Sequence, residues 1–200
     1  MGANAIERVL RFWLGELPDH GTPPPEDRQR SWFGGGRAFD ERVRRELGGE
    51  VERALSGELD GWAETPRGAL ALVILLDQLT RNVFRGTPRA YRGDSKALQV
   101  ARSVIARGDD ESLHPVERAF LYMPFMHAED PDVQERSVEM FRALAEASPK
   151  PLQPLLGTFH RHARAHRDEI ARFGRFPARN VVLDRTTTPQ ELEFLKRGRE

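Results

Sequence analysis

The sequence contains no cysteine, which excludes disulfide bonds, thiolate metal sites and a catalytic thiol. It also lacks any apolar run close to the ~20 residues that a membrane span needs. Its first residues, MGANAIERVLRFWLGEL, have neither the basic stretch nor the small-residue cleavage site of a secretory signal. They show instead the spacing of an amphipathic helix. We therefore expect a cytoplasmic protein that has no membrane partner.

An excess of charge of one sign is missing as well, because 31 basic residues balance 31 acidic ones. Binding along a nucleic-acid backbone needs a basic excess on one face, so we expect no nucleic-acid partner. The basic residues are 28 Arg and only 3 Lys. Arginine forks bind carboxylates and phosphates through paired hydrogen bonds, although a GC-rich genome is the simpler explanation for most of these arginines.

Strand signals are nearly absent, and no Asn-Gly or Asp-Gly turn joins two alternating runs. Periodicity and start signals such as Thr65-Pro66 predict an all-α fold. The expected helices, about eight in number, cover 4–14, 38–56, 66–80, 94–107, 115–127, 131–147, 152–173 and 189–197. Segments 15–36 and 174–187 are predicted to be irregular. No linker divides the chain, so residues 1–200 form one domain, and short connections favour antiparallel helical hairpins.

The helix over 66–80 contains ALALVILL, is apolar on all sides and should be central. DQLTRN follows it directly. Asp77 lies on a buried stripe with Arg81 one turn further on, and Gln78 and Asn82 form a second pair at the same spacing. The Asp77–Arg81 pair either locks the end of the helix or holds an arginine toward an anionic ligand.

Two further helices carry histidines that are candidates for a structural or a functional role. His166 lies in an apolar stripe with Phe159, Ala163 and Ile170, where it is either a hydrogen-bonded core residue or a ligand or general base. His127 is expected at a helix C-terminus, since Pro124 should kink or stop that helix just before it. Asp130 is the expected N-cap of the next helix.

Glu129 has no evident structural role, so it is a candidate to orient a catalytic histidine. Together with His127, His162 and His166 it could supply ligand types for a metal ion. The spacing of these four residues matches no standard motif, and we expect neither a metal nor another cofactor. No nucleophile elbow, phosphate loop or dinucleotide fingerprint occurs in the sequence.

The loop after the helix over 152–173 alternates arginine and phenylalanine. Gly174 suits a helix C-cap, and Pro177 stops any continuation. We expect Phe176 to pack inward while Arg175, Arg179 and Asn180 point toward a pocket. The alternative is a loop that its arginines pin to helix C-terminal carbonyls.

The stretches LALVILLDQLTRNVFRGTPRAY, FLYMPFMHAED with QERSVEMF, and HRDEIARFGRFPARN with TTTPQELEFL occur in that order. Over roughly Phe12 to Leu195 the chain resembles the bacterial domain of unknown function 924 family. The resemblance implies a tetratricopeptide-like helical fold, as a right-handed superhelix or bundle, and implies no activity. Two positions depart from the family pattern, which usually has His at Ala178 and Gly at Asp184.

Two functions remain open. In the first, one pocket binds a small anionic ligand through Asp77, Arg81, Asn82, Arg175, Arg179 and Asn180, with Arg81 and Arg175 clamping the anion. His127 or His166 would then act as general base or acid, oriented by Glu129. In the second, the chain is a helical-repeat adaptor for a peptide or protein partner, and the polar clusters only hold the fold together.

Overall fold

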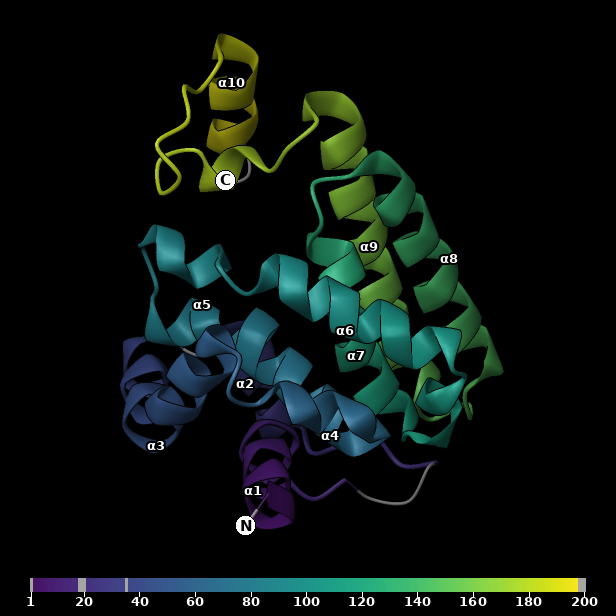
Figure 1. Cartoon of the computed structure of the whole chain (residues 1–200). Coiled ribbons are helices and arrows are strands. Elements are labelled where there is room, and N and C mark those ends of the chain that lie inside the picture. Colours follow the sequence, from purple (N-terminus) through teal and green to yellow (C-terminus); the bar gives the residue numbers. More distant parts are fainter. Residues whose placement is uncertain (1, 18–20, 35, 198–200) are drawn as a thin grey trace.

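The computed structural model describes residues 2–17, 21–34 and 36–197, and within them the chain is helical and has no strand. Figure 1 shows the arrangement. The α-helices are α1 (Gly2–Leu14), α2 (Glu26–Gly34), α3 (Gly36–Ser56), α4 (Pro66–Val73), α5 (Thr80–Val83), α6 (Asp94–Ala106), α7 (Pro115–His127), α8 (Pro131–Ala147), α9 (Gln153–Phe173) and α10 (Pro189–Arg197). Short 3-10 helices lie at Asp60–Glu64, Pro88–Tyr91, Asp109–Ser112 and Pro177–Arg179.

Each predicted helix is present, and the start signals act as expected. The Thr65 side chain accepts from the Gly68 N–H at 3.2 Å, and Asp130 accepts from Asp132 and Val133 at 2.9 and 3.1 Å. At the other end of a helix, Gly174 takes a φ of 68° at the C-cap of α9. Side-chain caps of this kind satisfy the first orphan N–H groups of a helix, so they are readable from sequence.

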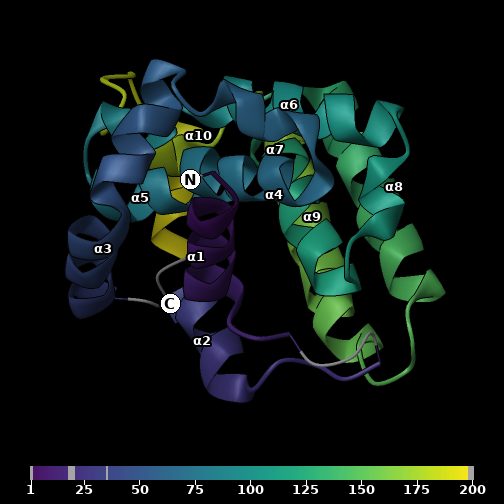
Figure 2. The same cartoon turned by 60° about the horizontal axis from the view of Figure 1, so that its bottom comes forward.

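The prediction that 15–36 is irregular was wrong, because α2 lies within it. The helix follows the three prolines and begins with Glu26 and Asp27, whose charges suit a helix N-terminus. Side chains of α2 bind the last residues of α1. Trp32 Nε1 donates to the Trp13 carbonyl at 2.9 Å, and Arg28 donates to the Phe12 carbonyl at 2.9 Å. Figure 2 shows α2 packed beside the end of α1.

The central helix runs from Pro66 to Val83 through α4, a π-helical segment η2 (Ile74–Leu79) and α5. All residues from Ala69 to Leu76 are fully buried, as the apolar run predicts. The helix packs against α1, α3, α6 and α7. π turns inside α-helices are rare and are frequently found at functional sites, and this one contains Asp77 and Gln78.

Helix α7 has the predicted bounds and continues through Pro124 to His127, so of the two effects expected of Pro124, a kink or a stop, the stop does not occur. Proline removes one backbone hydrogen bond. Every residue from Ala119 to Met126 is buried, so packing on all sides of this segment outweighs that loss. The consequence is that His127 is the last residue of a buried helix, facing the central helix.

Helices α6 to α9 each pack against the next in the chain, and α7 to α9 lie together at the right of Figure 1. Phe159 of α9 lies edge-on to Phe120 of α7 at 5.7 Å and stacks on Phe141 of α8 at 6.0 Å between ring centroids. Helix α10 lies at the top of Figure 1 and contacts the Pro177–Arg179 turn. No helix among the described residues is long and apolar enough to cross a bilayer.

Candidate functional site

Asp77 is the centre of the polar residues in the central helix, and its side chain is fully buried. The Nδ1 atom of His127 lies 2.8 and 2.9 Å from the two Asp77 carboxylate oxygens. The Gln78 side-chain amide donates to the same carboxylate. Arg81 Nη1 lies 3.6 Å away, one turn along the helix, so the predicted Asp77–Arg81 pair is confirmed.

These partners keep Asp77 ionised. Burial alone would raise the pKa of its carboxyl group, but the opposing effects of His127 and Arg81 hold that pKa well below its usual range. A carboxylate only accepts hydrogen bonds. The Nδ1 atom of His127 therefore carries a proton and donates to Asp77. An Asp–His pair of this geometry orients an imidazole for general-base chemistry.

A second carboxylate, Asp94, joins two arginines. Arg81 donates to both of its oxygens at 3.0 and 3.1 Å, and Arg179 donates to one of them at 3.4 Å. Arg179 also donates to the His127 carbonyl at 2.9 Å. Burial raises the pKa of Asp94, and Arg81 opposes that effect. We call Asp77, Arg81, Asp94, His127 and Arg179 the central ionic cluster.

His166 is half-buried beside this cluster. Its Nδ1 lies 3.1 Å from the Met126 carbonyl, which can only accept, so Nδ1 carries the proton. Its ring centroid is 6.1 Å from that of His127 and 5.1 Å from that of Phe176. Burial lowers the pKa of His166 to about 4, and the neighbouring His127 adds to the effect. His166 is therefore a neutral imidazole at pH 7.

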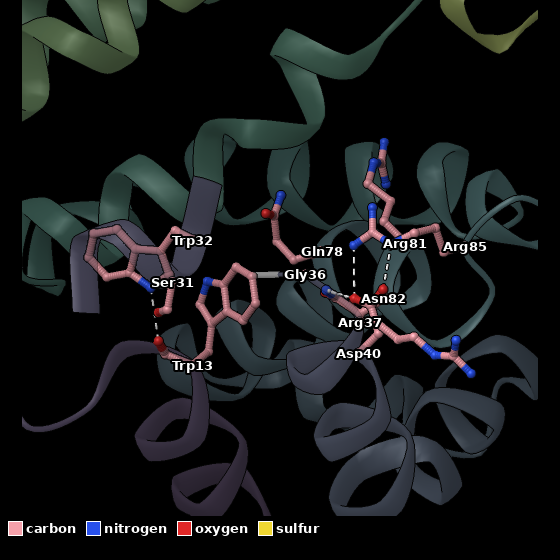
Figure 3. Close-up of a pocket in the computed structure, with 10 residues that line it drawn as sticks. All are labelled: Trp13, Ser31, Trp32, Gly36, Arg37, Asp40, Gln78, Arg81, Asn82 and Arg85. Atoms are coloured by element: carbon pink, nitrogen blue, oxygen red, sulfur yellow. Dashed lines mark hydrogen bonds and ion pairs between the residues drawn. The ribbon is translucent and has the colours of Figure 1, made fainter. Parts of the chain in front are cut away.

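A cavity of about 700 Å³ borders the cluster on the side of α2 and α3. We call it the first cavity, and Figure 3 shows its lining: Trp13, Ser31, Trp32, Gly36, Arg37, Asp40, Gln78, Arg81, Asn82 and Arg85. The two indoles lie at one end, and the guanidinium groups of Arg81 and Arg85 lie at the other. Gln78 stands between them, so the residue bonded to Asp77 also faces the cavity.

Asp40 organises the cationic end of the first cavity. It accepts from the Asn82 amide at 2.7 Å and from Arg85 Nη2 at 2.8 Å. The Arg85 guanidinium outweighs the effect of burial and lowers the pKa of Asp40. The expected Gln78–Asn82 pair does not form, because Gln78 bonds to Asp77 and Asn82 bonds to Asp40.

Three residues predicted for the pocket are engaged elsewhere. Arg175 donates to Glu191 at 2.7 and 3.0 Å, and the buried Asn180 donates to the same carboxylate at 3.2 Å. Both therefore anchor α10, and Arg175 does not share an anion with Arg81. Glu129 accepts from the Phe176 N–H and from Arg185, both at 2.9 Å.

The role expected of Glu129, orientation of His127, is thus filled by Asp77. Sequence spacing could not show this, since Asp77 and His127 are 50 positions apart. Phe176 is buried, as expected. Arg179 donates to a helix C-terminal carbonyl, which is the contact that the alternative interpretation of the loop predicts. In the described part of the chain, no three histidine or carboxylate side chains are grouped closely enough to hold a metal ion.

Asp40, Asp94, Trp13 and Trp32 were missed as site residues. Asp94 begins a predicted helix, where an acidic residue is ordinary. Trp13 belongs to the first amphipathic helix, and Trp32 lies in the segment that was predicted to be irregular. The signal that could have found Asp40 is its polar side chain on the inward face of an amphipathic helix, where it is only 6% exposed. Asp184, one of the two departures from the family pattern, has a φ of 53°, a conformation that favours glycine.

Comparisons with known proteins agree with the fold and leave the chemistry open. A solved structure described as a protein of unknown function, ATU0120 from Agrobacterium tumefaciens, is 37% identical and superposes with a TM-score of 0.80, covering 98% of this chain and 99% of that one. Among curated proteins, none matches. The model of a family described as bacterial protein of unknown function (DUF924) matches residues 9–199. The chain therefore belongs to the DUF924 family of bacterial proteins of unknown function.

Proposed function

We propose that the protein binds a small molecule with an aromatic or other flat apolar portion and one anionic group in the first cavity. The observation that carries the proposal is the polarity of the cavity, with Trp13 and Trp32 at one end and Arg81 and Arg85 at the other. Its volume of about 700 Å³ is within the range of small-molecule sites, which combine apolar surfaces with a few placed polar groups.

Pre-organisation supports the same proposal. Asp94 holds Arg81 through two hydrogen bonds, and Asp40 holds Arg85. A ligand that meets a fixed guanidinium loses less side-chain entropy on binding than one that must order it. The paired carboxylates reduce the net charge of the arginines, so binding relies on directed hydrogen bonds more than on charge.

We propose that His127 is the general base if the bound molecule undergoes a reaction. Asp77 accepts from both Gln78, which lines the cavity, and His127. This carboxylate therefore links the ligand site to the imidazole of His127, which is not itself among the lining residues. His166 is neutral and lies beside His127, so it is a second candidate for proton transfer.

The binding test uses 1-naphthoate as an aromatic carboxylate and 1-naphthalenemethanol as its uncharged counterpart. Binding is followed by tryptophan fluorescence, since Trp13 and Trp32 line the cavity. We expect saturable binding of the carboxylate that weakens about tenfold in Arg85→Gln, the loss expected for one charge-assisted hydrogen bond. Arg30→Gln, an exposed site on α2, is the matched control. Equal binding of both compounds, or no change in Arg85→Gln, would contradict the proposal.

The adaptor alternative has less support. A peptide-binding groove on a tetratricopeptide-like superhelix would present a continuous apolar surface. The large hydrophobic side chains exposed among the described residues are Val181 and Leu192, both near the C-terminus. The pairing of α6 to α9 in chain order is what favours a tetratricopeptide-like relationship, and it carries no information about a partner.

A further inference from the structure

A second cavity, of about 500 Å³, borders the central ionic cluster at Asp94 and Arg179. We define it by its lining residues, which are Pro88, Arg89, Tyr91, Arg92, Asp94, Ser95, Arg179, Leu183 and Arg185. Four arginines and one aspartate give this lining a formal charge of +3. The two cavities share no lining residue, but Arg81 borders the first and its partner Asp94 borders the second.

Two of the four arginines in the second cavity have no carboxylate of their own, among the described residues, to balance their charge. Arg89 pairs with Glu52 at 2.6 Å, and Arg185 pairs with Glu129 at 2.8 Å. Arg92 is exposed and has no hydrogen bond, ion pair or ring contact from its side chain in the described part of the chain. Arg179 must share Asp94 with Arg81, which holds that carboxylate at shorter distances.

Arg179 is also poorly solvated, because its side chain is only 13% exposed. Burial lowers the pKa of its guanidinium. Asp94 raises this pKa, and the nearby positive charge of Arg81 lowers it. A buried cation that is only partly compensated gains from an additional anion. The ring of Tyr91 packs against this guanidinium, and the Cζ atom of Arg179 lies 4.8 Å from the ring centroid.

We propose that the second cavity binds a phosphate monoester of a small molecule, with the phosphoryl group between Arg92 and Arg179. A phosphate monoester carries close to two negative charges and three terminal oxygens, which match the planar forks of two arginines. The ring of Tyr91 and the side chains of Pro88 and Leu183 supply apolar surface for the rest of the molecule. The proposal does not depend on a ligand in the first cavity.

Gly93 keeps the second cavity next to the central helix. A Cβ at this position would lie 2.3 Å from the Leu76 carbonyl oxygen, so only glycine allows the approach. Helix α6 starts at the next residue, and its first two residues, Asp94 and Ser95, line the cavity. The close approach is therefore what brings Asp94 within reach of both Arg81 and Arg179.

The test is titration of the full chain with phenyl phosphate and, separately, with inorganic phosphate, followed by calorimetry and by amide chemical shifts. We expect saturable shifts of the Tyr91 and Ser95 amides, separate from those that an aromatic anion in the first cavity would give at Gln78 and Asn82. Arg92→Gln should weaken phenyl phosphate binding about tenfold or more, the loss expected for one charge-assisted hydrogen bond. Because the Arg92 side chain has no partner among the described residues, the melting temperature of Arg92→Gln should match that of the wild type.

Arg102→Gln is the matched control, since Arg102 is an exposed arginine on α6 that does not line the cavity. The proposal is overturned if Arg102→Gln and Arg92→Gln bind phenyl phosphate equally, or if the wild type shows no saturable binding. Shifts confined to Gln78 and Asn82 would place the ligand in the first cavity and would also overturn it. Arg85→Gln, which alters the first cavity, should leave the shifts of Tyr91 and Ser95 unchanged, so this outcome stays separate from that of the first cavity.

Discussion

His166 should make the stability of the fold depend on pH between 7 and 5. Its pKa is about 4 in the folded chain against 6.5 as the ordinary value. The folded state therefore binds fewer protons than the unfolded state in this interval, and stability falls as pH falls. At pH 5 the protonation of the unfolded imidazole favours unfolding by about 2 kcal/mol, and at pH 7 by only about 0.2 kcal/mol. The loss levels off once the pH drops below about 4.

The assay is urea denaturation at pH 7 and pH 5 for the wild type and His166→Gln. Glutamine does not titrate and can still donate to the Met126 carbonyl, so the variant isolates the charge change. We expect the free energy of unfolding of the wild type to drop by about 2 kcal/mol more than that of the variant. Arg164→Gln, an exposed change on α9, is the control and should keep the wild-type drop. Equal drops in the wild type and His166→Gln would refute the reasoning.

Three other substitutions test the packing of the site by denaturation at pH 7. Asp77→Ala should cost about 3–5 kcal/mol, because it leaves Gln78 and His127 without the buried carboxylate that accepts from them, whereas Asp168→Ala, at an exposed pair, should cost less than about 1 kcal/mol. Asp184→Gly should stabilise by about 0.5 kcal/mol through relief of its positive φ of 53°. Gly93→Ala should cost about 1–3 kcal/mol by forcing its new Cβ against the Leu76 carbonyl. A neutral Asp77→Ala, or a destabilising Asp184→Gly, would contradict these assignments.

The helices were predictable because their signals are local. Thr65, Asp130 and Thr188 cap helices within three residues of themselves, and the apolar run at 69–76 needs no distant information to indicate burial. The wrong prediction at α2 and the continuation of α7 through Pro124 have one cause. In both places a proline signals a break by local rules, and contacts with distant parts of the chain decide otherwise: Trp32 with Trp13 for α2, and burial on all sides for the end of α7.

In the candidate site too, local pairs could be predicted from the sequence and distant partners could not. The Asp77–Arg81 pair is visible from sequence because positions four apart on a helix are neighbours. The partners of that pair are His127, at 50 positions, and Asp94, at 13, and only packing of α6 and α7 on the central helix brings them there. The close approach at Gly93 is part of that packing, and its effect on Asp94 could not be read from the order of residues.

The C-terminal loop shows most clearly what each level determines. Its alternating arginines and aromatic residues predict a buried Phe176 and a set of directed guanidinium groups, and nothing local tells Arg175 from Arg179. The structure separates them, because Arg175 meets Glu191 of α10 whereas Arg179 meets Asp94 and the end of α7. Local chemistry thus determined which residues carry charge into the fold. The tertiary structure decided which carboxylate each one reaches. Residues this close in sequence have the same local surroundings, so only the elements packed against them make their partners differ.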